Sequence, residues 1–319
     1  MKTILVALLL LGSLALGFAQ GSLTPPGPPA PMMKSLDQIE ARTPISSAPF
    51  AITNPGSYYL TTNLSVSLGD AITINTDPVS LNLNGFTISS TRPTATVDAA
   101  IRIGNGVTDV TIRNGHIKSG VTNNAAGVYN GGGFAYGILA ALQNYNLCVS
   151  EVSVVGCLVH GIYLGNNTST LVDSCTVRTA GNFGIEAQNV SHSAAYNCGQ
   201  YGILAGTGTD CYGHSVGSGW GIYGINLNQC YGYNTATGIG LQASTAIGCY
   251  GYSVGGTGPN VLSAASWCWP KRCATTGLSP DSTDWMNPIS IIFLPSSRMC
   301  CCWAPGPHSA FPIRACTGP

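Results

Sequence analysis

The triplet Cys211-Tyr212-Gly213 recurs as Cys230-Tyr231-Gly232 and again as Cys249-Tyr250-Gly251, each time 19 residues further along the chain. A unit of about 20 residues is too short to bury an apolar face by itself, so neighbouring units must stack and share one core. Glycine, asparagine and serine separate short runs of β-branched and aromatic residues, a pattern typical of strands joined by tight turns. The repeat therefore predicts an all-β solenoid of parallel strands, a β-helix.

The same period extends towards the N-terminus as pairs of a glycine and an aliphatic residue. The pairs are Gly137-Ile138, Gly161-Ile162, Gly184-Ile185, Gly202-Ile203, Gly221-Ile222 and Gly240-Leu241. The first three steps between them are 24, 23 and 18 residues, so the coils differ in length. Extra loop costs only about 0.6 kcal/mol per doubling of its length. We therefore expect the additional residues at turns, with the strands kept in step.

The composition favours one elongated domain and argues against nucleic-acid binding. Only 8% of the 319 residues are charged, the formal net charge is zero, and 41 glycines fill many positions. A chain without a basic run lacks the electrostatic attraction that drives binding to phosphate backbones. No nucleic-acid partner is predicted.

Both ends of the chain differ from the repeat. Residues 1–19 have the form of a secretory signal peptide, with Lys2 before an apolar run and small residues ending at Ala19. Residues 20–32 form a Pro-rich linker, and Ser35-Leu36-Asp37-Gln38 has the capping-box pattern of a short helix that could close the first coil. We expect a secreted or cell-surface protein on a bacterial export pathway, with no transmembrane segment once the signal is removed.

The last segment, residues 266–319, loses the period and is rich in Cys, Trp and Pro. Two interpretations are open. It is either a separate Cys-rich cap or an aberrant, disordered tail translated out of the ancestral frame.

The segments Met33–Glu40, Pro55–Leu60 and Leu81–Phe86 resemble the secreted bacterial right-handed parallel β-helix repeat proteins with a pectin-lyase-like fold. The resemblance covers residues 33–265. It implies a right-handed parallel β-helix with a short N-terminal helical cap and an extracellular setting. Members of this group mostly lack an assigned activity, whereas characterised proteins of similar fold, such as pectate lyases and polygalacturonases, act on acidic polysaccharides. Fold analogy alone does not assign that chemistry to this chain.

The repeated triplet predicts two columns of stacked side chains. Cys211, Cys230 and Cys249 would lie above one another at the strand spacing of about 4.8 Å. We interpret them as buried thiols, because parallel Cβ vectors disfavour a disulfide. If the cysteines face inward, then Tyr212, Tyr231 and Tyr250 face outward, where they could bind sugar rings or simply stabilise neighbouring coils. The coils contain no Cys-x-x-Cys pair with His, so no metal site and no cofactor is predicted.

Catalytic residues are harder to find. Asp173 and Asp210 each precede the aliphatic residue of a following pair by 12 positions, with Ser191 between them in the intervening coil. Two rungs would separate them by roughly 10 Å, near the limit for an inverting glycosidase, although turn residues are the plainer interpretation. His160, Glu186 and Arg178 form a second weak candidate cluster, with a structural turn histidine as the alternative.

Three functional hypotheses follow in order. The first is a non-catalytic extracellular or surface module that binds polysaccharide or cell-surface glycan through a polar and aromatic face. The second is a polysaccharide lyase or glycoside hydrolase that acts on acidic polysaccharide. The third is a structural or adhesive envelope protein.

Overall fold

The computed structural model describes residues 42–124, 127–140, 143–165, 169–266 and 269–271. The chain divides into two compact units, residues 1–41 and residues 42–319, and every described residue belongs to the second. The regular secondary structure in the described ranges is all strand, and none of it is a helix that could span a membrane. The expected signal peptide, linker and N-terminal helical cap lie outside these residues, as does nearly all of the C-terminal tail.

Parallel strands form one 24-stranded sheet, which the chain builds as three rows. Row A contains β2 (Phe50–Ile52), β5 (Ile72–Ile74), β8 (Ala99–Ile103), β12 (Tyr136–Ala140), β14 (His160–Tyr163) and the first parts of β17 (Phe183–Ser191), β19 (Tyr201–Thr209), β21 (Trp220–Asn228), β23 (Ile239–Ile247) and β25 (Pro259–Ser266). Row B contains β1 (Thr43–Ile45), β3 (Gly56–Leu60), β6 (Val79–Asn82), the first parts of β9 (Thr108–Lys118) and β13 (Tyr145–Cys157), β15 (Thr170–Asp173) and the second parts of β17, β19, β21, β23 and β25. Row C contains β4 (Leu64–Val66), β7 (Thr87–Ser90), the ends of β9 and β13, β16 (Thr176–Ala180), β18 (Ala194–Cys198), β20 (Tyr212–Ser215), β22 (Tyr231–Asn234), β24 (Tyr250–Ser253) and β26 (Trp269–Lys271).

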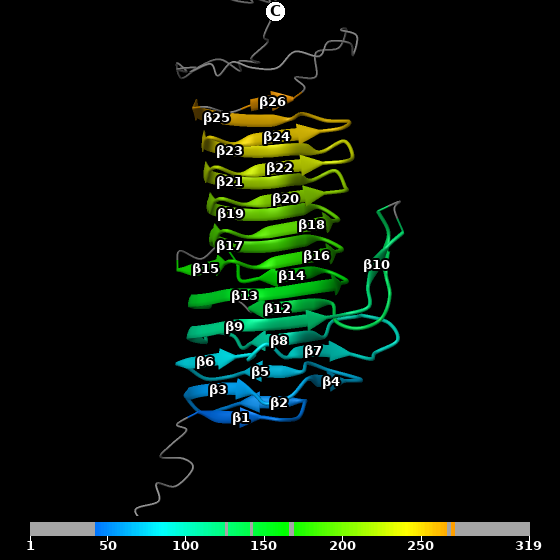
Figure 1. Ribbon diagram of the computed structural model, residues 1–319, viewed down its shortest axis with the longest axis vertical. Coiled ribbons are helices and arrows are strands. Elements are labelled where there is room, and N and C mark those ends of the chain that lie inside the picture. Colours follow the sequence, from blue (N-terminus) through cyan, green and yellow to red (C-terminus); the bar gives the residue numbers. More distant parts are fainter. Residues whose placement is uncertain (1–41, 125–126, 141–142, 166–168, 267–268, 272–319) are drawn as a thin grey trace, which may run out of the picture. The chain divides into compact units, whose positions relative to one another are not determined.

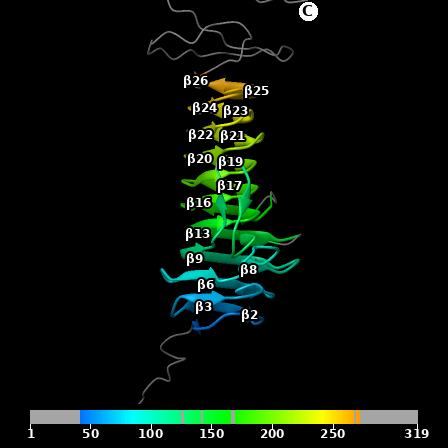
Figure 2. The same cartoon turned by 90° about the vertical axis from the view of Figure 1, so that its right-hand side faces the viewer.

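The chain passes through rows A, B and C in turn and then returns to row A one rung further along (Figure 1). Residues one repeat apart are therefore neighbours, as in the pairs Tyr212–Tyr231 and Tyr231–Tyr250. Turned by 90°, the rungs lie one above another as successive layers (Figure 2). An all-parallel sheet arranged in this way is consistent with a β-helix-like solenoid.

The glycine–aliphatic pairs mark the corner where the chain enters row A. The aliphatic residues Ile203, Ile222 and Leu241 are fully buried in the core. A Cβ atom on Gly202 would lie 2.5 Å from the His214 backbone nitrogen and closer still to the Gly221 carbonyl oxygen. In these later coils the corner leaves no room for a side chain, which explains why glycine precedes the buried aliphatic residue, whereas alanine takes this place in the first coils at Ala71 and Ala100.

The corner between rows B and C has a left-handed residue in each coil. Ser174, His192, Asp210 and Gln229 have φ angles of 46° to 53°. The next residue of each coil points into the core, where the side chains of Cys175, Cys211, Cys230 and Cys249 are buried. The predicted inward column of cysteines is thus present from Cys211 to Cys249, and Ser193 separates it from Cys175.

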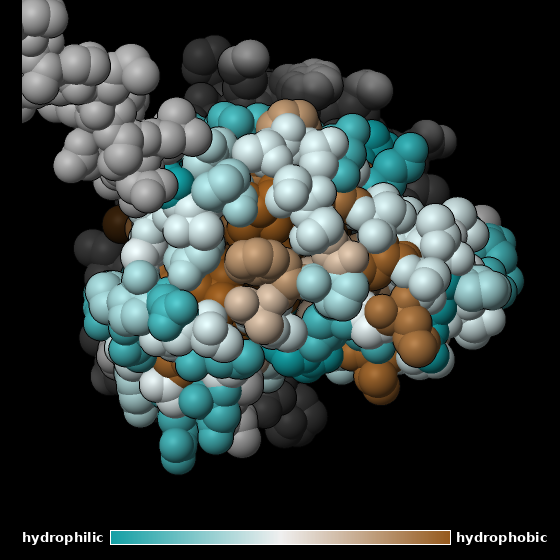
Figure 3. Space-filling model, turned by 90° about the horizontal axis from the view of Figure 1, so that it is seen from below, coloured by the Kyte–Doolittle hydropathy of each residue, from teal (hydrophilic) through white to brown (hydrophobic). Residues whose placement is uncertain are grey.

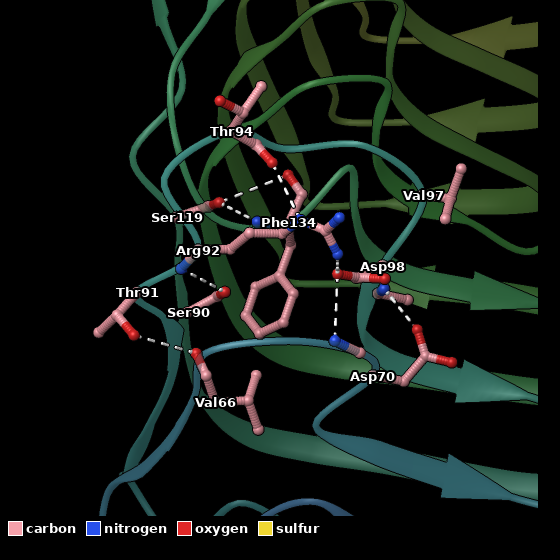
Figure 4. Close-up of polar contacts among 12 residues, drawn as sticks. Val66, Asp70, Ser90, Thr91, Arg92, Thr94, Val97, Asp98, Ser119 and Phe134 are labelled. Carbon is pink, nitrogen blue, oxygen red and sulfur yellow. Dashed lines mark hydrogen bonds and ion pairs between the residues drawn. The ribbon is translucent and has the colours of Figure 1, made fainter.

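Extra residues lie in turns, as the coil lengths predict: between β12 and β13 and between β14 and β15 they join row A to row B, and in the two larger insertions they join row C to row A. Loop 91–98 is closed by an ion pair between Arg92 and Asp98, and the Asp98 carboxylate also accepts a hydrogen bond from the Gly69 N–H (Figure 4). A second insertion forms the antiparallel hairpin of β10 (Thr122–Asn123) and β11 (Tyr129–Asn130), which stands beside the stack in Figure 1.

At the β1 end of the stack, apolar residues gather at the centre within a ring of polar ones (Figure 3). Ala48 and Phe50 pack against the core here, over the fully buried Ile45 and Ile52. The apolar interior therefore continues to the first rung.

Candidate functional site

The outer face of row C has a column of tyrosines at the positions of the repeated triplet. Tyr212 stacks on Tyr231 with ring centroids 5.2 Å apart, and Tyr231 stacks on Tyr250 at 4.8 Å. The interplanar angles are 16° and 7°, so the three rings are nearly parallel. Each ring is half-buried, while the cysteine before it is buried. The tyrosines share one register and face away from the thiols, as the alternation predicts.

A second column lies beside the first, two residues further along each strand. His214 stacks on Tyr233 at 4.7 Å, and Tyr233 stacks on Tyr252 at 5.3 Å, again with nearly parallel rings. We did not predict this column from the sequence. The alternation that places the tyrosine of each triplet outward also places the residue two positions later outward, so the signal was present. We call these six rings the row C ladder.

Stacking along the row C ladder determines what the face presents to solvent. Because the rings cover one another's faces, an approaching ligand meets ring edges and phenol hydroxyls. Within the described residues, the hydroxyls of Tyr212, Tyr231, Tyr250, Tyr233 and Tyr252 have no hydrogen-bond partner in the protein. Burial raises the pKa of Tyr212 to about 12, so its hydroxyl remains a donor at physiological pH. The face offers a regular row of donor and acceptor groups.

On the rungs before the ladder, towards β7, the outer face of row C carries basic side chains and a shallow depression. Tyr196 lies 4.9 Å from Tyr212 with tilted rings, and the Arg178 guanidinium lies 5.9 Å from the Tyr196 ring centroid. Still lower, small and basic side chains line a shallow depression: Thr87, His116, Lys118, Ser153 and Val155. These residues lie in row C like the ladder, and a register shift in β18 separates the depression from the two aligned columns.

The hairpin of β10 and β11 is fixed to the edge of this surface through Asn197. The Tyr129 hydroxyl donates to the Asn197 carbonyl at 2.9 Å, and the Asn123 amide donates to the Asn197 side-chain oxygen at 2.8 Å. Asn197 lies at an irregularity in β18, and its N–H donates to His214 Nδ1 at 3.3 Å. The His214 proton therefore resides on Nε2. Burial lowers the pKa of His214, which favours the neutral ring.

The two carboxylates predicted as a catalytic pair come together in a different way. Asp173 pairs with Ser191, and Ser191 pairs with Thr209, so Asp210 lies one position beyond the predicted register. The difference lies in the turn after β20. Ser215 and Ile222 are seven residues apart, whereas the residues with which they pair, Cys198 and Ile203, are five apart. The register shift in β18 offsets one of these two additional residues.

His192, which we did not predict, connects the two aspartates at the B-to-C corner. His192 Nδ1 lies 2.9 Å from Asp173 Oδ1, and its Nε2 lies 3.7 Å from Asp210 Oδ2. The hydrogen bond with Asp173 raises the pKa of His192, and hydrogen bonds from His192 and Ser191 lower the pKa of Asp173. The described residues contain no group of three or more acidic, His or Cys side chains arranged to hold a metal ion. The trio is an exposed chain of charges along a turn.

The other predicted cluster is divided between two faces. His160 and Glu186 both lie on the outer face of row A, but Arg178 lies on row C, so the predicted trio is wrong. His160 Nδ1 accepts a hydrogen bond from the Phe183 N–H at 3.3 Å, and its ring stacks on Tyr163 at 4.7 Å. In register, Glu186 is the neighbour of Tyr163 rather than of His160. The sequence spacing identified the right face for two of the three residues.

Comparisons with protein-family models, with curated proteins and with solved structures find no match to this chain.

Proposed function

We propose that this chain is an exported, single-domain right-handed parallel β-helix of the pectin-lyase-like kind, and that it binds glycans without catalysis through the outer face of row C. In this proposal residues 1–19 are the export signal, and a short helical cap lies N-terminal to the strands. The row C ladder is the observation that carries the functional part, because six stacked rings form a rigid face that bears a regular row of hydroxyls.

The physical argument rests on preorganisation. Rung spacing holds successive hydroxyls about 4.8 Å apart, so an extended polymer with regularly spaced hydroxyl groups can form repeated hydrogen bonds along the ladder. The stacked rings have little rotational freedom left to lose, which reduces the entropic cost of binding. Each phenol hydroxyl can both donate and accept a hydrogen bond, as sugar hydroxyls do, so the two are complementary. Arg178 and Lys118 add positive charge at the lower end.

A polysaccharide lyase or glycoside hydrolase is the second candidate, and the Asp173–His192–Asp210 chain is the observation that favours it. A hydrolase needs one carboxyl group held protonated beside another that is ionised. Here hydrogen bonds favour the ionised form of Asp173, and His192 is shared by both aspartates. This arrangement fits an electrostatic brace of the turn better than an acid and base pair.

The test separates hydroxyl-mediated binding from ring stacking. In the Tyr212→Phe, Tyr231→Phe and Tyr250→Phe triple variant, the stacked rings remain and three hydroxyls are removed. We expect glycan-array binding by the full-length mature chain to fall at least about tenfold, because each lost hydrogen bond contributes about 1 kcal/mol. The melting temperature should change little. Tyr145→Phe, which alters an exposed tyrosine of β13, is the matched control.

Three outcomes would count against the proposal. Unchanged binding by the triple variant would show that the ladder is not the binding face. An absence of glycan binding by the wild-type chain would favour the structural or adhesive role. Release of shortened oligosaccharides that stops in Asp173→Asn or Asp210→Asn would establish the enzyme.

A further inference from the structure

The outer face of row A contains a buried carboxyl group without a countercharge. Glu186 is only 7% exposed and lies between Tyr163 of β14 and Leu204 of β19 in register. Within the described residues its carboxyl group has no hydrogen bond and no ion pair. Arg102, an arginine of the same row, is three rungs away and is already paired with Asp70. The face therefore carries one unbalanced negative charge when Glu186 is ionised.

Aromatic rings lie on the same outer face, next to Glu186 in register and along the start of the row A strands. One run follows the start of the row A strands, with ring centroids 4.7 to 5.6 Å apart: Tyr136, His160, Phe183, Tyr201 and Trp220. Tyr163 stacks on His160 at 4.7 Å, and Tyr223 lies 5.4 Å from Trp220. Except for His160, these rings are half-buried, so the group is open to the outside. We call Glu186, His160, Tyr163, Tyr201 and Leu204 the Glu186 cluster.

Charge and ring geometry favour one kind of ligand. An isolated carboxylate that is removed from water is unfavourable unless a positive charge accompanies it. Aromatic rings attract cations to their negative faces, and the attraction is strongest where water is excluded. Anions gain nothing from such a site, and neutral ligands do not relieve the buried charge.

We propose that the Glu186 cluster is a binding site for a cationic ammonium group, separate from the row C ladder and independent of its function. The carboxylate of Glu186 provides the countercharge, and Tyr163 and Tyr201 provide the aromatic sides. The ammonium group can belong to a quaternary amine such as choline or to the primary amine of an amino sugar. Both share the chemistry that the cluster recognises, and separate probes distinguish them.

The pH dependence of binding follows from the groups that face Glu186. These are His160 and Tyr163 of β14, Tyr201 of β19 and, two rungs further on, Tyr223 of β21. Burial lowers the pKa of His160 to about 4 and raises that of Tyr163 and Tyr201, so these three are neutral at pH 7. Burial also raises the pKa of Glu186 to about 7. An ammonium ligand must therefore displace a proton from Glu186 at acidic pH but not at alkaline pH.

Calorimetry on the full-length mature chain tests the proposal directly. Choline, a permanent cation, is titrated at pH 6 and pH 8.5 in buffers of different ionisation enthalpy, and a glucosamine tetramer is titrated at pH 6 only, because its amines lose their protons at pH 8.5. We expect release of about one proton per ligand at pH 6 and almost none at pH 8.5. Affinity should be about tenfold higher at pH 8.5, because the ionised fraction of Glu186 rises by that factor. Binding of only one probe identifies which source of ammonium the site accepts.

Neutral ligands and matched variants provide the controls. 3,3-Dimethyl-1-butanol has the shape of choline without its charge, and the N-acetylated tetramer is the neutral counterpart of the amino sugar. Glu186→Gln preserves the size of the side chain and should reduce ammonium affinity at least about tenfold and abolish proton release. Glu151→Gln, at an exposed carboxylate of β13, should leave both unchanged.

Three results would overturn the proposal. One is equal binding of the charged and neutral ligands. Another is binding by Glu186→Gln with wild-type affinity. The third is no heat from either ammonium probe at millimolar concentration in a chain that circular dichroism shows to be folded.

Discussion

Replacement of Gly202 by alanine tests the account of the row A corner. Gly202 and Gly206 belong to the same strand, β19, and neither has a left-handed backbone. A Cβ atom on Gly202 would lie 2.5 Å from the His214 nitrogen and 2.7 Å from the Gly213 carbonyl carbon, both of which are backbone atoms. The three atoms nearest to a Cβ atom on Gly206 all belong to the amide end of the Gln188 side chain, which can move away.

The expected cost follows from what must shift. Ordinary contacts to Cβ are about 1 Å longer than these, so the rung that contains Gly202 must move away from its neighbours. Overpacking of this kind typically costs about 1–3 kcal/mol. Weakening two ladder hydrogen bonds adds about 1 kcal/mol each. We therefore expect Gly202→Ala to lose about 3–5 kcal/mol, and Gly206→Ala to change stability by less than about 1 kcal/mol.

Thermal unfolding followed by circular dichroism measures the difference. For a chain of this size, 1 kcal/mol corresponds to about 2–4 °C, so Gly202→Ala should melt about 10 °C below Gly206→Ala. If the two variants melt within about 2 °C of each other, the corner tolerates a side chain, and steric exclusion does not explain the recurring glycines.

Three further predictions concern single side chains. The pKa of Glu186 is about 7 in the folded chain against an ordinary 4.5, so the stability that its protonated form provides is present below pH 4.5 and is lost as the pH rises through 7. In chemical denaturation, the free energy of unfolding of the wild type should fall by up to about 3 kcal/mol between pH 4 and pH 9. That of Glu186→Gln should fall by less. An NMR titration should give His192 a pKa above 6.5 that returns towards 6.5 in Asp173→Asn, because the hydrogen bond with Asp173 favours the charged ring; an unchanged value would remove Asp173 as the cause. Tyr129→Phe removes one hydrogen bond to Asn197 and should cost about 1 kcal/mol, with faster amide exchange in residues 122–130 and no change in β21 to β23.

Periodicity alone predicts much of this architecture. The glycine–aliphatic pairs identify the corner before row A, and the alternation within each triplet separates the buried Cys230 from the outward Tyr231. Both inferences depend on local rules, because a strand alternates its side chains and a corner excludes Cβ atoms. Variable loop length does not disturb them, since insertions leave the strands in register.

The candidate sites depend on information that periodicity lacks. Sequence spacing places Asp210 one residue away from its observed register, because the turn between β20 and β21 is longer than the turn between β18 and β19. Arg178 was grouped with Glu186 because sequence distance does not reveal which of three outer faces a residue occupies. The pairing of His192 with Asp173 depends on side-chain rotamers at a left-handed corner, which no spacing rule predicts.

The coils from β19 to β24 have the same length and register, which affects how the chain can evolve. Ile203, Ile222 and Leu241 share one register in row A, and Tyr212, Tyr231 and Tyr250 share another in row C. A coding segment of one 19-residue unit could therefore be duplicated or deleted by unequal recombination without misaligning any strand. Each such event would lengthen or shorten the row C ladder by one pair of rings, so the reach of this face along a polymer can evolve by copy number rather than by point mutation.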